Sequence, residues 1–93
     1  MLFTLDLKKY RSRTDIVAQI LSLTRESPAT KTRIMYAVFL SYAQLKEYLS
    51  LLLESGLLEF TAVDRTYRTT EKGIDYLHSY EKMSTLSGAE RAS

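Results

Sequence analysis

A short polar stretch between positions 43 and 50 carries side chains that can recognise the edges of DNA bases. Its residues, which fall outside the apolar spacing of the segment, are Ala43, Gln44, Lys46, Glu47 and Ser50. A glutamine can pair with adenine, a lysine with guanine, and a glutamate can accept a hydrogen bond from the amino group of cytosine. The alternative interpretation is a solvated helix face without a partner, and the spacing alone leaves both open.

Basic side chains from separate regions of the chain are candidates for contacts with DNA phosphates. They are Arg11, Arg13, Lys31, Arg33, Arg65, Arg68 and Lys72. The run 8–13 holds four positive charges and no acid. Such a run is typical either of an arm that reaches phosphates or of a solvated leader into a helix. Ordinary surface charge is the alternative for all of these residues, and only convergence on one face would separate the two interpretations.

The composition argues against catalysis and against a metal site. Among 93 residues there is no cysteine and one histidine, His78, and the formal net charge is +2. No Ser/His/Asp constellation, glycine-rich phosphate loop or spaced set of metal ligands is present. We therefore expect no enzymatic activity, no cofactor and no metal. No apolar run has the length of a membrane span or of a signal peptide, so we expect a cytoplasmic protein of the nucleoid.

Caps and apolar spacing predict two helices in the first half of the chain. The first follows the capping-box pair Ser12 and Asp15 and ends near Glu26. The second follows Thr30 as its N-cap and ends near Leu40. In both, apolar residues recur at intervals of three and four, so that each helix buries one face.

A third helix is predicted over 42–55, and the short connection from the second is that of a helix-turn-helix. Ser41 is its N-cap and Gln44 completes a second capping box. Gly56 is placed to end this helix in a left-handed conformation. The residues interpreted as core or near-core are Tyr36, Tyr42, Leu45, Tyr48, Leu49, Leu52 and Leu53.

Alternating polar and apolar residues predict a β-hairpin over 57–70, with its turn at 63–66. Residues 1–10 are interpreted as an N-terminal arm or a short strand. The domain is predicted to span 11–86 and to be followed by a disordered tail over 87–93. Together these elements predict an α+β fold that is mostly helical, with three helices, a β-hairpin wing and a C-terminal helix.

The C-terminal helix predicted over 71–86 has more apolar surface than one packing face requires. Ile74 and Leu77 form one stripe, which we expect to close the domain. A second stripe consists of Tyr76, Tyr80 and Met83. We expect this stripe to form a homodimer across a two-fold axis, where the same patch serves both partners. The alternative is that both stripes are buried within one protomer.

Five segments of the sequence resemble the archaeal winged helix-turn-helix family, which includes the ten-kilodalton archaeal DNA-binding proteins and small predicted transcriptional regulators. The segments are Arg11-Ser-Arg through Ile16, Lys31-Thr-Arg-Ile-Met-Tyr36, Leu40-Ser-Tyr42, Leu51-Leu-Leu-Glu-Ser-Gly56 and Tyr67-Arg-Thr-Thr-Glu-Lys-Gly73. The resemblance implies binding of double-stranded DNA, with helix 42–55 in the major groove and hairpin 57–70 as the wing. It also implies dimerisation through the last helix.

The third helix departs from the family members that coat DNA. Where those carry an additional arginine and lysine, this chain has Glu47 and Ser50. Its one cation, Lys46, is outnumbered by Glu47 and Glu54. A recognition helix without net positive charge favours a transcriptional regulator, or a winged helix that binds another protein and no DNA, over a nucleoid-associated protein of low sequence preference.

Overall fold

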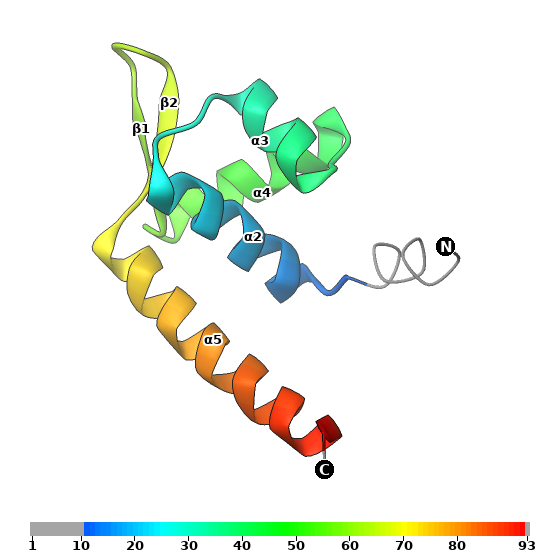
Figure 1. The fold of residues 1–93 in the computed structure, drawn as a ribbon. Coiled ribbons are helices and arrows are strands. Elements are labelled where there is room, and N and C mark those ends of the chain that lie inside the picture. Colours follow the sequence, from blue (N-terminus) through cyan, green and yellow to red (C-terminus); the bar gives the residue numbers. More distant parts are fainter. Residues whose placement is uncertain (1–10, 93) are drawn as a thin grey trace.

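The computed structural model describes the backbone of residues 11–92 and the side chains of residues 11–83, and within this part four helices and one antiparallel hairpin follow one another (Figure 1). The elements are α2 (Arg13–Glu26), α3 (Lys31–Val38), α4 (Tyr42–Glu54), β1 (Leu58–Thr61), β2 (Thr66–Thr69) and α5 (Glu71–Ala92). This order confirms the predicted mostly helical α+β fold. The predicted arm or strand over 1–10 lies outside the described residues.

Side-chain caps begin the first three of these helices where the sequence predicts them. The Ser12 hydroxyl accepts from the Asp15 N–H at 3.1 Å, and the Asp15 carboxylate accepts from the Ser12 N–H at 3.1 Å. Ser41 and Gln44 make the same reciprocal pair at 3.1 and 3.0 Å. Thr30 caps α3 through a backbone N–H of its first turn at 3.2 Å. These bonds satisfy amides that the first turn of a helix leaves unpaired.

The hairpin differs from the prediction by one residue. The last rung pairs Thr61 with Thr66, so that the turn occupies 62–65 and not 63–66. Arg65 closes the turn with a positive φ of 57°. That left-handed residue reverses the chain early enough for Thr66 to join the strand.

The segment between α2 and α3 joins the hairpin, which the sequence did not predict. The Ala29 N–H donates to the Tyr67 carbonyl at 3.0 Å, and the Tyr67 N–H donates to the Ala29 carbonyl at 2.8 Å. These bonds use the outer edge of β2. They tie this segment to the hairpin at one point, and Figure 1 shows the segment passing β2 before it turns toward α3.

The core lies where α2, α3 and α4 meet the base of the hairpin and the first turns of α5. The apolar side chains with almost no exposed surface are Ile20, Leu21, Ile34, Leu45, Leu52 and Leu77. Tyr48 is buried as predicted, but Tyr36 and Tyr42 are 70% and 56% exposed. Leu53, also predicted in the core, is 37% exposed. The prediction was wrong for these three side chains, because each lies at the edge of the buried face of its helix or outside that face.

Helix α5 is fastened to the end of α4 by the segment Thr70-Glu-Lys-Gly73. The Thr70 hydroxyl accepts from the Gly73 N–H at 3.1 Å and donates to the Gly56 carbonyl at 2.6 Å. Gly56 itself has φ 77°, which ends α4 as predicted. The backbone of Gly73 approaches the Leu57 carbonyl so closely that a β-carbon would lie 2.5 Å from that oxygen. The glycine therefore sets how near α5 sits to the hairpin.

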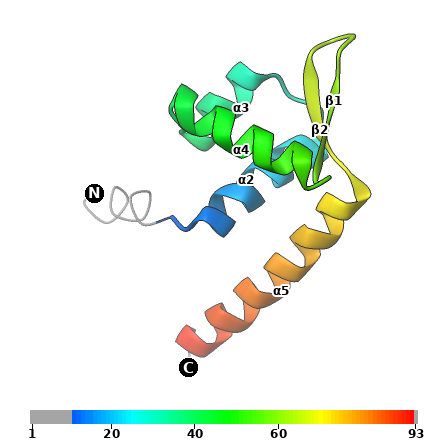
Figure 2. The same ribbon diagram turned by 180° about the vertical axis from the view of Figure 1, so that it is seen from behind.

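Helix α5 is longer than predicted. The sequence predicted its end at 86 and a disordered tail over 87–93, whereas the helix continues to Ala92. The added residues contain no proline, and although Gly88 is a poor helix former, the alanine, glutamate and arginine residues that follow it are good ones. The far part of α5 extends past the N-terminal end of α2 and away from the hairpin (Figures 1 and 2).

The second apolar stripe of α5 is largely used within the chain. Tyr76 and Tyr80 are half-buried and pack against the core. The Tyr80 hydroxyl donates a hydrogen bond to the Asp15 carboxylate at the start of α2. Met83 remains 69% exposed. Of the three residues predicted at a dimer interface, Met83 is therefore the one whose surface the protomer leaves mostly uncovered.

Replacing Tyr80 with phenylalanine is expected to weaken the acid dependence of stability. The Tyr80 hydrogen bond is the largest cause, ahead of those from Ser12, that holds the pKa of Asp15 below its ordinary value of 3.8. The ionised carboxylate thus stabilises the fold above that pH, and the contribution is lost as pH falls through the lowered pKa. Urea unfolding at pH 7 and pH 3 should show a smaller difference for Tyr80→Phe than for the unchanged protein.

Tyr76→Phe is the matched control, because it removes a phenolic hydroxyl from the same helix without touching Asp15. It should leave the difference between the two pH values unchanged. An equal loss of stability at both pH values in Tyr80→Phe would show that the hydroxyl does not act through the Asp15 carboxylate.

Candidate nucleic-acid interface

The five base-reading candidates are all exposed on α4, in the way their spacing predicts. They are Ala43, Gln44, Lys46, Glu47 and Ser50. The buried face of the same helix carries Leu45 and Leu52. Figure 2 shows α4 on the near side of the molecule, in front of α3. A ligand as wide as a DNA duplex can therefore approach this face of α4.

Two of these candidates already have partners within the chain. The Gln44 side-chain oxygen accepts from the Ser41 N–H at 3.0 Å, so its amide NH₂ is the group left to donate. The Lys46 ammonium lies 5.4 Å from the centre of the Tyr42 ring. Both side chains are thus held near the N-terminal turn of α4 before any ligand binds.

Arg11, predicted as a phosphate contact, has a structural role. Its guanidinium donates to the Val38 carbonyl at 2.7 Å, to the Phe39 carbonyl at 3.3 Å and to the Gln19 side chain at 2.5 Å. The last carbonyls of a helix have no partner within it and carry partial negative charge, so they attract a cation. Arg11 therefore caps the end of α3, and its contact with phosphate stays a prediction.

Lys72 has the same kind of role at the end of α4. Its ammonium donates to the Ser55 carbonyl at 2.8 Å. The lysine follows Thr70 in the segment that fastens α5, so its charge serves the packing of α4 against α5. A contact of Lys72 with phosphate stays a prediction.

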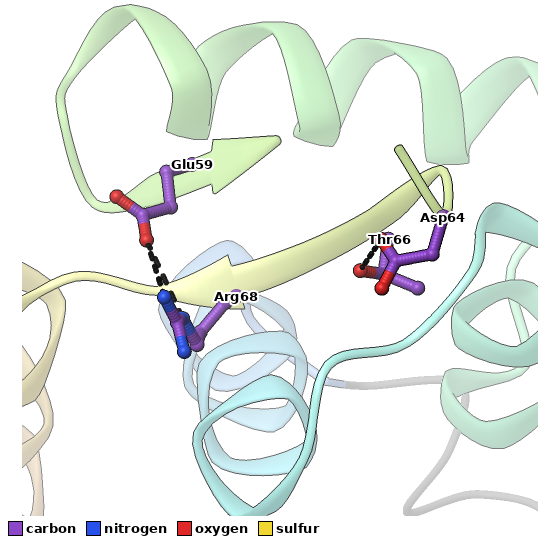
Figure 3. A network of polar contacts seen from close by, with 4 residues as sticks. All are labelled: Glu59, Asp64, Thr66 and Arg68. Carbon is purple, nitrogen blue, oxygen red and sulfur yellow. Dashed lines mark hydrogen bonds and ion pairs between the residues drawn. The ribbon is translucent and has the colours of Figure 1, made fainter. Parts of the chain in front are cut away.

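Arg68 and Arg13 are exposed but have partners. The Arg68 guanidinium lies 3.2 Å from a Glu59 carboxylate oxygen across the hairpin, and both side chains are about half exposed (Figure 3). An exposed pair of this kind contributes about 0–1 kcal/mol, so a phosphate can compete for the arginine. The Arg13 guanidinium stacks on the Tyr48 ring with 5.1 Å to its centre.

Lys31 and Arg65 line the same groove although they are far apart in the sequence. Both line a groove of about 750 Å³ between the first turn of α3 and the hairpin. Its other lining residues are Thr30, Thr32, Phe60, Ala62 and Tyr67. We call this the α3–hairpin groove. The bridge between Ala29 and Tyr67 is the reason for it, because it brings the start of α3 against β2.

The α3–hairpin groove is lined by cations and by two aromatic side chains. The Phe60 and Tyr67 rings are 4.9 Å apart between centres. At the tip of the hairpin the Asp64 side chain accepts from the Thr66 hydroxyl at 2.8 Å, which orders the turn that carries Arg65 (Figure 3). Cations, hydroxyls and apolar surface together suit the phosphates and sugars of a nucleic-acid backbone.

The first turn of α3 carries positive charge that no acid within the turn balances. The first turn of α2 contains Asp15 and that of α5 contains Glu71, whereas the first turn of α3 has no acid. It has Lys31 and Arg33 instead, at the positive end of the helix dipole. A bound anion would relieve this repulsion, and helix N-termini are frequent phosphate contacts.

Tyr67, which lines the α3–hairpin groove, has a raised pKa. Burial first, and the Tyr42 phenol second, raise the pKa of Tyr67 above its ordinary value of 10.0. Sequence reasoning placed Tyr42 in or near the core, and the signal it missed was the position of this residue on the flank of the helix.

Two further findings concern the part of the chain that the structure describes. No group of three or more potential metal ligands occurs among its residues. None of its helices is both long enough and apolar enough to cross a membrane.

Comparison with known proteins identifies similar chains. A profile of the winged helix-turn-helix family matches residues 10–88. The chain is similar to the solved structure of Sso10a-2, a DNA-binding protein from Sulfolobus solfataricus, with 26% identity, a TM-score of 0.73, and coverage of 88% of this chain and 87% of that one. It shares its fold with wild-type ZitR of Lactococcus lactis, with 24% identity, a TM-score of 0.65, and coverage of 88% of this chain and 59% of ZitR. No curated protein sequence matches.

Proposed function

Since this chain belongs to the winged helix-turn-helix family, we propose that it binds double-stranded DNA and acts as a transcriptional regulator. Helix α4 enters the major groove with its exposed polar face, and the hairpin β1–β2 is the wing that lies along the adjacent backbone. The protein then works on the chromosome, in the nucleoid of the cytoplasm.

The observation that carries this proposal is the α3–hairpin groove, whose walls present cations unpaired within the described part of the chain, and the exposed polar face of α4 supports it. Lys31 and Arg65 line the groove, and Arg33 is exposed in the same first turn of α3. Among the described residues these three cations have no ion pair or side-chain hydrogen bond, so they are available to phosphates. The similarity to Sso10a-2, which is itself a DNA-binding protein, supports the same function.

We also propose that the protein acts as a homodimer through α5. The far part of this helix extends beyond α2, and Met83 is 69% exposed there. A two-fold dimer presents two copies of α4 to successive major grooves, which matches the symmetry of the sites that such proteins read. Tyr76 and Tyr80 contribute to this interface only with the surface that α2 and the core leave uncovered.

Affinity for a labelled duplex is expected to fall with salt, with a slope of about −5 in a plot of log affinity against log salt. The value follows if Lys31, Arg33 and Arg65 of each protomer neutralise one phosphate apiece, which gives about six contacts in a dimer. A monomer would give about −3. The measurement is a mobility-shift or anisotropy titration over a range of salt, accompanied by light scattering to determine the mass.

Binding experiments with the same protein and labelled DNA also test two alternative functions. Absence of binding even at low salt would contradict the proposal and favour a winged helix that binds another protein. Selection of bound sequences from a random duplex pool separates a regulator, which enriches one motif, from a nucleoid-associated protein, which enriches none. The acidic Glu47 lies on the side of α4 that we propose enters the major groove of DNA. It favours the regulator, because it opposes indiscriminate attraction to DNA.

A further inference from the structure

Tyr42 occupies an unusual position for an aromatic residue. It is the first residue of α4, directly after the Ser41 cap, and it is 56% exposed. Its ring therefore contributes little to the core. An exposed tyrosine at the start of the helix that we propose enters the major groove is available for a role other than core packing.

The Tyr42 ring holds Lys46. These two residues are four apart, so they lie on the same side of α4 one turn apart. The Lys46 ammonium lies 5.4 Å from the ring centre, within the range of a cation–π contact. The other neighbours of Lys46 at three or four positions are Ala43, Leu49 and Ser50, and none of them carries an opposite charge. Tyr42 is thus its attractive neighbour on the helix.

We propose that Tyr42 is a positioning residue that holds the Lys46 ammonium for contact with a guanine edge, and so helps to set the sequence preference of the protein. This inference rests on the proposed function. It adds a residue whose role is exerted through Lys46 and does not require that the tyrosine itself touch a base.

The benefit of such a contact is a smaller loss of freedom on binding. A lysine side chain has many rotamers, and fixing it on a ligand costs conformational entropy. The ring restricts the stem of Lys46 in the free protein while leaving the N–H groups that point away from the ring able to donate. The same ammonium, if mobile, would be drawn to any phosphate within reach, and it would then contribute affinity without preference.

A double-mutant cycle on the full chain tests the coupling between the two residues. The variants are Tyr42→Leu, Lys46→Met and both together, and the quantity measured is the ratio of affinities for the selected duplex and for duplexes changed at one base pair. Lys46→Met should lower the ratio roughly tenfold at one guanine. Tyr42→Leu should lower it roughly threefold at the same base, and should have no further effect when Lys46 is already methionine.

Two controls make the result specific. Tyr42→Phe retains the aromatic face and should keep the ratio of the unchanged protein. The Lys46 methylene protons should show an upfield ring-current shift by NMR in the free protein and in Tyr42→Phe, and should lose it in Tyr42→Leu. That readout shows the pairing without DNA.

The possible failures are distinguishable. Additive effects in the double variant, or a Tyr42→Leu protein with an unchanged ratio, would overturn the inference and leave DNA binding intact. If Lys46→Met weakened binding to every duplex by the same factor, Lys46 would be contacting a phosphate. That result would also overturn the inference. A protein that binds no duplex would overturn the proposed function, and the positioning role with it.

Discussion

Replacing Gly73 with alanine is expected to lower the free energy of unfolding by about 3 kcal/mol, the upper end of the usual cost of overpacking. A β-carbon at this position would lie 2.5 Å from the Leu57 carbonyl oxygen and 2.5 Å from the Thr69 methyl group. The carbonyl belongs to the backbone that leads into β1, so it cannot rotate away as a side chain would. Either α5 or the hairpin must shift. Urea unfolding followed by circular dichroism measures the loss.

Gly56→Ala is the matched control, because it adds the same methyl group to the same part of the fold. The nearest atom to its β-carbon is the Lys72 Cδ at 3.8 Å, which is ordinary contact. The cost there is backbone strain, because Gly56 has φ 77°, and we expect about 1 kcal/mol. If Gly73→Ala were no more destabilising than Gly56→Ala, the close approach of α5 to the hairpin would be wrong.

The sequence predicted the helices well because their starts depend on local contacts. The pairs Ser12–Asp15 and Ser41–Gln44 are three residues apart, so each capping box is complete within four positions of the chain. The end of α4 was predicted for the same reason, since Gly56 needs only its own conformational freedom. The hairpin turn was displaced by one residue because its type depends on the left-handed conformation of Arg65, for which arginine gives no signal.

The roles of the basic residues could not be predicted, because their partners are distant in the sequence. Arg11 donates to the Val38 carbonyl 27 positions away and Lys72 to the Ser55 carbonyl 17 positions away. Those carbonyls are backbone groups that any residue presents, so no sequence pattern marks them. The joining of Lys31 and Arg65 in one groove likewise depends on the backbone bridge at Ala29, which has no side-chain signature.

The exposed tyrosines were assigned to the core because aromatic residues at intervals of three and four are usually buried. On α4 the fully buried side chains are Leu45 and Leu52, and the direction between them defines the inner face. Tyr42 lies at the edge of that face and, at the first turn, has no further turn of α4 before it to pack against. The helical angle alone does not separate Tyr42 from Tyr48, because the two lie at similar angles on either side of the inner face. What distinguishes Tyr42 is its position as the first residue of α4.

Neutralising both cations of the α3–hairpin groove, in the double variant Lys31→Met, Arg65→Met, is expected to lower the DNA affinity of the dimer by about three to four orders of magnitude at about 0.1 M salt. Each phosphate contact contributes about 0.9 to the salt slope, so each is worth about tenfold at that salt concentration relative to 1 M. The slope for a dimer should become shallower by about four, because two contacts are lost in each protomer. The measurement is the same duplex titration, repeated with the variant.

Lys82→Met is the control for net charge. Lys82 is exposed on α5, which leads away from the hairpin in both views of the fold (Figures 1 and 2). Its loss should change affinity by less than about twofold, because an exposed charge more than about 10 Å from the DNA is screened at this salt. An equal effect of Lys82→Met and Lys31→Met would mean that overall charge governs binding. A double variant with normal affinity would place the DNA elsewhere, and the α3–hairpin groove would no longer support a DNA-binding function.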